Sequence, residues 1–211
     1  MLITDNDEAR ALLSDPGAVP PPADDGPGAL ARLRSLVCRF SSGQEHAERR
    51  EAVEQVLATL DPADLRRAAA GLRHEPAERV PALVLGAAFG VADLERLVTA
   101  VDGAARGYLS GERDREADEG AALLLELLDV PRATILLQAH AATGALIAKA
   151  RTRPVEEVLR FDPPVRVLRR VGADIDVAAA NREGPVLTFG YGTRPCPASA
   201  HALAIVEGAL S

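Results

Sequence analysis

Apolar residues recur at helical spacing through most of this 211-residue chain. Turn residues, chiefly Pro, Gly and Asp, separate the stretches that have this spacing, and several stretches begin after an aspartate that can cap a helix. The pattern predicts helices over residues 7–14, 29–40, 45–60, 62–73, 76–90, 93–109, 117–128, 132–149 and 154–161. Residues 18–28, rich in Pro, Gly and Asp, predict a loop, which we interpret as a linker rather than a functional lid.

Composition narrows the class of protein. Hydrophobic residues make up 47% of the chain and charged residues 26%, which is typical of a soluble, helix-rich domain, and the length suits one domain over residues 1–211. The net charge of −7, without a basic run, argues against nucleic acid and against an anionic membrane surface as partners. The longest apolar stretch is too short to span a bilayer, and the beginning of the sequence has no signal-peptide pattern. Two cysteines far apart in sequence suit reduced thiols, so we expect a cytoplasmic protein.

One stretch, Phe189 to Ala204, carries the most distinctive chemistry. Gly190 and Gly192 allow the positive φ angles of a tight loop, and Pro197 suits the first position of a helix. Cys196 would then lie at a helix N-terminus, where a thiolate is favoured over a thiol. The alternative is a buried structural cysteine beside an ordinary loop.

The pattern Phe-Gly-x-Gly-x-Arg-x-Cys in this stretch resembles the haem-binding loop of the cytochromes P-450. The resemblance implies that the thiolate of the cysteine is the axial ligand of iron in haem b (iron protoporphyrin IX). It also implies that the phenylalanine covers the sulfur and that the arginine contacts the cofactor. The residues that fill the pattern are Phe189, Gly190, Gly192, Arg194 and Cys196.

Other motifs resemble the same family and follow its order along almost the whole chain. His46 and Arg50 fill the H-x-x-x-R pattern that contacts the haem propionates. Glu157 and Arg160 fill an E-x-x-R pattern, which implies a buried ion pair that braces the cysteine loop. A P-P-V sequence follows, and then a strand whose Arg169 or Arg170 contacts a propionate; the sequence leaves both open. We therefore expect a mainly α fold with a small β element, a cytochrome P-450-like fold shortened to about half the usual length.

The predicted helix over residues 132–149 departs from the family at its centre. By position it resembles the long distal helix with the core A-G-x-[DE]-T-T, in which an acid and an alcohol deliver protons to iron-bound dioxygen. Here Ala141 and Ala142 take those two positions, and Thr143 alone agrees. His140 and Thr143 share roughly one face and are the candidate catalytic residues. A lone histidine on an apolar helix is more often a core residue, and a distal-pocket acid or a second axial ligand is the alternative role for His140.

These features predict a haem-thiolate oxidoreductase, a bacterial tailoring enzyme of secondary metabolism that oxidises or rearranges a small or carrier-bound metabolite. Both a monooxygenase or peroxygenase reaction and an electron-independent reaction are consistent with the missing proton-delivery pair, so a redox partner is left open. A haem sensor or carrier with His140 on the iron is a further alternative. The remaining one is a scaffold or helper protein of the same fold without its own catalysis. Because the shortened core leaves apolar surface, we expect a homodimer or a partner subunit.

Overall fold

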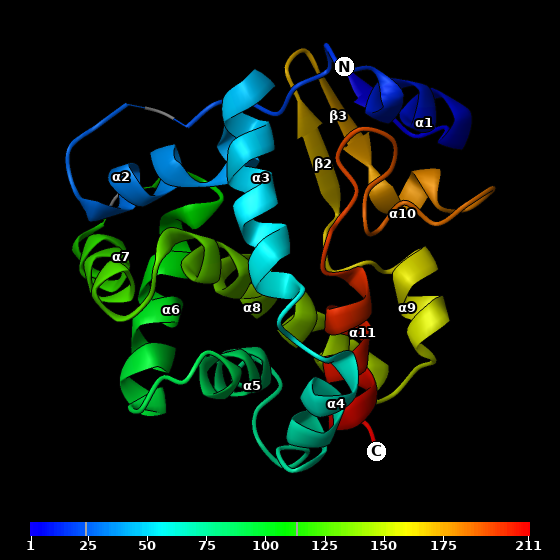
Figure 1. The fold of residues 1–211 in the computed structure, drawn as a ribbon. Coiled ribbons are helices and arrows are strands. Elements are labelled where there is room, and N and C mark those ends of the chain that lie inside the picture. The colour runs from blue at the N-terminus through cyan, green and yellow to red at the C-terminus, as the bar shows by residue number, and fades with distance from the viewer. Residues whose placement is uncertain (24, 113) are drawn as a thin grey trace.

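Helices form most of the molecule, and a small sheet lies at one end of it (Figure 1). The structure is a computed structural model, which describes residues 1–23, 25–112 and 114–211. The α-helices are α1 (Asn6–Ser14), α2 (Ala29–Leu36), α3 (Gly43–Leu57), α4 (Pro62–Ala70), α5 (Val80–Ala88), α6 (Leu94–Tyr108), α7 (Arg115–Leu127), α8 (Val130–Ala150), α9 (Val155–Phe161), α10 (Val177–Ala180) and α11 (Ser199–Ala209).

The predicted helices are present, and aspartate side chains cap several of them. Asp5 accepts from the backbone N–H of Glu8, and Asp61 and Asp93 cap α4 and α6 in the same way. The loop predicted over residues 18–28 is also present, although residue 24 lies outside the described residues. The fold thus follows the local signals of the sequence in most places.

Several predicted helix boundaries were wrong by a few residues, and two of these lie next to candidate site residues. The helix expected over residues 29–40 stops at Leu36, because Val37 is extended, and a 3-10 turn, η1 (Cys38–Phe40), follows. The last helix begins at Ser199 rather than at Pro197. A proline disfavours helical backbone in the residue before it, and the N–H of Cys196 donates instead to the carbonyl of Phe189.

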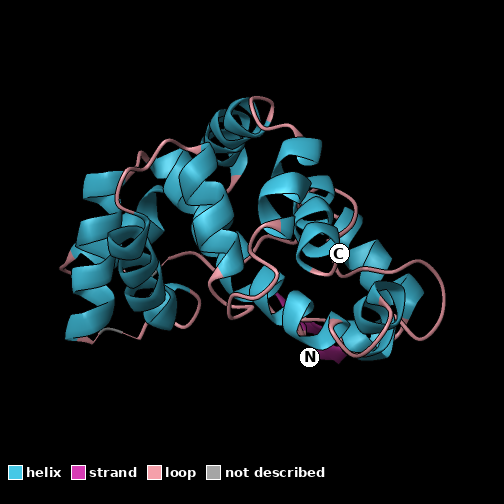
Figure 2. Cartoon of the chain, turned by 90° about the horizontal axis from the view of Figure 1, so that it is seen from below, coloured by secondary structure: helices cyan, strands magenta, loops and turns pink. Residues whose placement is uncertain are grey.

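Helix α8 is central to the larger core. It packs against α3, α5, α6 and α11, so it contacts both the helix that follows the cysteine loop and the helix that bears His46 and Arg50. Figure 2 shows the helices from below, with the strands set to one side. Among the described residues, no helix combines the length and apolar character needed to cross a bilayer.

The sheet has three short strands in the order β1-β3-β2, which are β1 (Leu2–Ile3), β2 (Val167–Arg170) and β3 (Ala173–Asp176). Strand β1 runs parallel to β3, and β2 runs antiparallel to it. One face of the sheet packs on α1 and on the segment before the cysteine loop. This small second core holds Ile3, Ala9, Leu13, Ala173, Ile175, Ala180 and Leu187.

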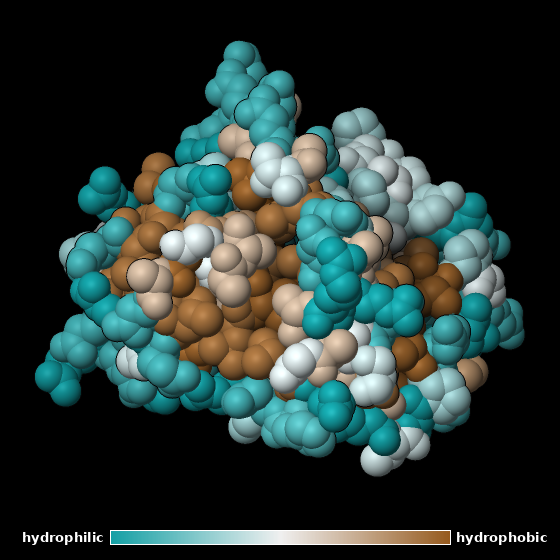
Figure 3. Space-filling view, turned by 60° about the horizontal axis from the view of Figure 1, so that its bottom comes forward, coloured by the Kyte–Doolittle hydropathy of each residue, from teal (hydrophilic) through white to brown (hydrophobic). Residues whose placement is uncertain are grey.

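Apolar residues also reach the surface of the helical part, where Figure 3 shows them framed by hydrophilic residues. At the end of α5, Ala87 and Ala88 are exposed. Large apolar side chains that are exposed are few among the described residues. They are Met1, Leu2, Leu109, Phe161, Val167, Val171 and Val186.

Candidate functional site

The loop before Cys196 has the backbone that its glycines predicted. Gly190 has a φ of 75° and Gly192 a φ of 65°, both in the left-handed region that favours glycine. A Cβ atom on Gly192 would collide with the carbonyl oxygen of Leu13 at the end of α1. The N–H of Thr193 donates to that same oxygen over 3.1 Å. The loop is therefore docked directly on α1.

Asn181 holds the start of this loop from within. It is fully buried, and its Nδ2 donates to the carbonyl of Leu159 and to Oγ1 of Thr188, each over 3.0 Å. Its Oδ1 accepts from the N–H of Leu187 over 2.7 Å. One side chain thus joins α9 to Leu187 and Thr188, which lead into the glycines.

Arg160 braces the same region, but not through the predicted ion pair with Glu157. Its Nη1 donates to the carbonyl of Asn181 over 2.7 Å and to that of Gly184 over 3.2 Å. Glu157 is exposed, and within the described part of the chain no ion pair joins it to Arg160. The backbone carbonyls of the turn over residues 181–184 need a hydrogen-bond donor, whereas water can solvate the exposed carboxylate of Glu157. The guanidinium of Arg160 therefore binds the turn.

Cys196 is an exposed residue. Protein atoms nevertheless crowd it, and this desolvation raises its pKa. The backbone N–H of Ala198 and the charge of Arg50 act in the opposite direction. Cys196 was expected at a helix N-terminus, but α11 begins three residues later, and in the protein by itself burial outweighs the stabilisation of the thiolate.

Several cations gather around this loop. Burial lowers the pKa of His46, and the charges of Arg194 and Arg50 lower it further. Burial likewise lowers the pKa of Arg170, helped by the charges of Arg194 and Arg39. The pKa of Arg194 itself is lowered by burial and by Arg50. These interactions link four arginines, Arg39, Arg50, Arg170 and Arg194, with His46, whose lowered pKa favours the neutral ring.

Little in the protein neutralises this cationic cluster, which we define as His46, Arg50, Arg170, Arg194 and Arg39. Arg50 pairs with Glu54 over 2.6 Å. Among the described residues, the other three arginines have no carboxylate partner, and the Nη1 atoms of Arg170 and Arg194 donate to backbone carbonyls. An anion of two charges would complete such a cluster.

The structure separates the two candidate strand arginines. Side chains alternate between the two faces of a strand. Arg170 is 9% exposed and lies with the cationic cluster, whereas Arg169 is exposed on the opposite face of the sheet. Arg170 is therefore the strand arginine that the fold brings to the cluster.

The candidate catalytic residues lie on α8. His140 is 7% exposed, and its Nε2 lies 3.0 Å from Oδ1 of Asp102 on α6. Burial lowers the pKa of His140, while the charges of Asp102 and Glu78 partly offset this effect. Its Nδ1 is buried and has no hydrogen-bond partner among the described residues. Thr143 is also buried, at 4% exposure, and Ala141 is exposed.

Sequence reasoning missed two participants. Arg39 lies in η1, which was expected to be part of an ordinary helix, and Asp102 lies on a helix without a motif. Cys38, next to Arg39, is instead a core cysteine, and burial raises the pKa of its thiol, although Arg50, Arg194 and Arg39 act against this. No local signal marks these residues, because their role depends on contacts with segments far away in sequence.

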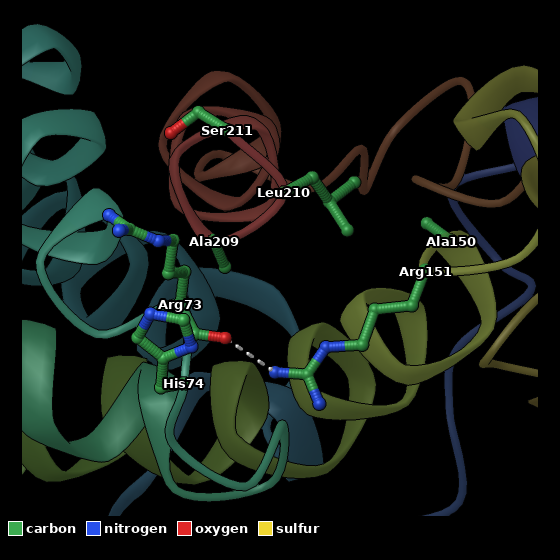
Figure 4. Close-up of a pocket in the computed structure, with 7 residues that line it drawn as sticks. All are labelled: Arg73, His74, Ala150, Arg151, Ala209, Leu210 and Ser211. Atoms are coloured by element: carbon green, nitrogen blue, oxygen red, sulfur yellow. Dashed lines mark hydrogen bonds between the residues drawn. The ribbon is translucent and has the colours of Figure 1, made fainter.

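Two surface cavities lie near opposite ends of α11. One of about 420 Å³ is lined by Pro197, His201 and residues at the end of α3, next to Cys196. The other, of about 300 Å³, lies where α4, α8 and α11 end (Figure 4). There Nη2 of Arg151 donates to the carbonyls of Arg73 and Glu75. An 11-residue helix is about 16 Å long, so this second cavity is remote from the cysteine.

No protein-family model and no curated protein matches the sequence. Solved structures do match the fold. P450BioI, solved in complex with hexadec-9Z-enoic acid ligated acyl carrier protein, aligns with a TM-score of 0.74 at 17% identity, over 99% of this chain and 82% of that one. A thermophilic cytochrome P-450 from Sulfolobus tokodaii aligns with a TM-score of 0.74 at 16% identity, over 99% and 84%. Ligand-free cytochrome P-450 TbtJ1 has a TM-score of 0.68 at 17% identity, over 99% and 82%. The chain therefore has the fold of the cytochromes P-450, in a shortened form.

Proposed function

We propose that the chain is a haem-thiolate protein in which Cys196 ligates the iron of haem b. The observation that carries this proposal is the cationic cluster beside Cys196, an exposed residue. Haem has two propionates, and the cluster lacks anions of that charge. The residues present therefore fit the cofactor.

Each site residue has a proposed role toward haem. Cys196 supplies the thiolate, and the positive φ angles of Gly190 and Gly192 let the loop pass close to the cofactor. Phe189 covers the sulfur. The propionates are bound by the guanidinium groups of Arg50, Arg170 and Arg194 and by a ring N–H of His46.

Bound haem would supply iron redox chemistry, which supports an oxidoreductase. We propose a single-domain, cytoplasmic bacterial enzyme that tailors a small or carrier-bound metabolite. A carrier-bound substrate is supported by the likeness to P450BioI, which was solved with a ligated acyl carrier protein. Peroxide use or an electron-independent reaction suits the chain, because Ala141 and Ala142 provide neither an acid nor a hydroxyl.

Proton movement would then depend on other groups of α8. We propose that His140 carries it, with Thr143 as a neighbouring hydroxyl on the same face. The imidazole can take a proton at one nitrogen and release it at the other. Asp102, whose side chain is 54% exposed, gives Nε2 of His140 a partner that solvent can reach.

Optical spectra test the cofactor proposal. We expect the protein grown with a haem precursor to show a Soret band that shifts to the red when the reduced protein binds carbon monoxide. Cys196→Ala should lose that shifted band, whereas Cys38→Ala, the matched control, should keep it. Haem that refuses carbon monoxide until His140→Ala is introduced would identify a six-coordinate sensor or carrier instead.

A second candidate is a haem-free scaffold or helper protein of the same fold. Ala141 and Ala142 favour it, since neither side chain can deliver a proton. A protein that is folded and monodisperse without haem, and takes up none in a titration, would establish this reading and refute the enzyme.

A further inference from the structure

The outer face of the small sheet is exposed, in contrast to the inner face. Leu2 pairs in register with Asp174, and Arg169 lies opposite Asp174 on the other side of β3, so these three residues share the outer face. Val167 lies two residues before Arg169 and projects from the same face. Leu2 is 60% exposed and Val167 is 38% exposed.

Apolar exposure is concentrated here. Val171, at the turn between β2 and β3, is 63% exposed, and Met1 adjoins it through a hydrogen bond to the carbonyl of Gly172. With Leu2 and Val167, these make four of the seven large exposed apolar residues named above. A concentration of this kind marks a contact surface better than single exposed residues do.

The same face carries charges of both signs that are not joined. Arg169 and Asp174 face each other in the antiparallel register, yet no ion pair connects them in the described ranges. The carboxylate of Asp176 is occupied, because it accepts from the N–H of Ala179 over 3.0 Å. One cation and one anion therefore remain available side by side.

We propose that this outer sheet face binds the same face of a second copy, in a twofold dimer. A twofold axis places Arg169 of each copy against the partner's Asp174. The same ion pair therefore forms twice across the interface. The apolar side chains Leu2, Val167 and Val171 are covered at the same time. A partner of a single charge sign would leave one of the two groups unpaired and desolvated, which is costly. The proposal goes beyond haem binding and does not depend on it.

Charge reversal tests this dimer with the full chain. Analytical ultracentrifugation should find wild-type dimers. Arg169→Asp and Asp174→Arg should each weaken self-association by about tenfold or more, since like charges then face each other. An equimolar mixture of these two variants should associate again, because one copy now presents two acids and the other two arginines. Leu109→Asp, which changes an exposed apolar residue elsewhere, should leave association unchanged.

Three results would overturn the proposal. The first is a wild-type protein that is monomeric at every concentration up to its solubility limit, and the second is charge variants that associate as the wild type does. The third is a mixture that stays monomeric although circular dichroism shows that both variants are folded. Val171→Asp provides a second route if either charge variant fails to fold. It should weaken the dimer without changing the charge pair.

Discussion

The imidazole of His140 and the carboxylate of Asp102 join α8 to α6, with Nε2 and Oδ1 3.0 Å apart. The ring is buried and the carboxylate is half exposed, so one end of this pair lies in the core and the other meets solvent. Glu78 adds a second negative charge nearby. The protonation of the buried His140 therefore depends on Asp102, an acid that solvent can reach.

Stability should therefore depend on pH near neutrality. Burial lowers the pKa of His140, so the folded protein binds that proton less readily than the unfolded chain, whose histidine pKa is about 6.5. The contribution of His140 is complete above about pH 6.5 and declines as the pH falls below it. Urea unfolding at a series of pH values should show this decline, and His140→Gln should reduce it. Asp102→Asn should make the loss of stability at low pH larger, because the protonated ring of His140 then lacks its partner. A pH profile identical to that of the wild type would contradict the pairing of His140 with Asp102.

Asp162 should control stability at a lower pH. Hydrogen bonds from Lys149 and Arg153 lower its pKa to about 2, and Arg166 lies 3.0 Å from the same carboxylate. Its contribution is present above about pH 4 and is lost as the pH falls from about 4 to about 2. Acid unfolding followed by circular dichroism should show this loss for the wild type and a smaller one for Asp162→Asn. Added salt should weaken the effect, since solvent reaches these side chains.

Arg170 and Arg169 should differ in their effect on haem affinity. Arg170→Met removes a charged hydrogen-bond donor from the cationic cluster, so haem should bind about 10- to 100-fold more weakly in an absorbance titration. Arg169→Met should leave the affinity nearly unchanged, because Arg169 lies on the other face of the sheet.

The haem-free protein gives an independent readout of the same cluster. There Arg170→Met should be neutral or stabilising by about 1 kcal/mol, because it removes a buried cation that Arg194 and Arg39 repel. Equal losses of haem affinity in the two variants, or a strong destabilisation of the haem-free protein, would refute the cluster.

Gly208 should be intolerant of even a methyl group. A Cβ atom there would collide with the carbonyl of Arg66 and lie 2.9 Å from Cβ of Ala69, where α11 crosses α4. We expect Gly208→Ala to lower the free energy of unfolding by about 1–3 kcal/mol in urea titrations. Gly71→Ala is the matched control, because Gly71 has a φ of −67° and its Cβ would meet nothing closer than 3.4 Å. That change should be neutral or slightly stabilising.

The sequence predicted the helices well because helix formation is encoded locally. Apolar spacing and caps such as Asp5, Asp61 and Asp93 involve residues a few positions apart. The positive φ angles of Gly190 and Gly192 were predictable for the same reason. The boundaries at Leu36 and Ser199 were not, since they depend on how the chain leaves one helix to pack against another element.

The sequence by itself determined the mainly helical fold, the glycine turn before Cys196 and the identity of most candidate cations. Only the tertiary structure decided that Arg170 rather than Arg169 joins the cluster, that Arg160 binds carbonyls rather than Glu157, and that His140 meets Asp102. The physical reason is the range of the interactions. Backbone conformation follows from neighbours along the chain, whereas burial and charge pairing are set by residues that are distant in sequence and adjacent in space.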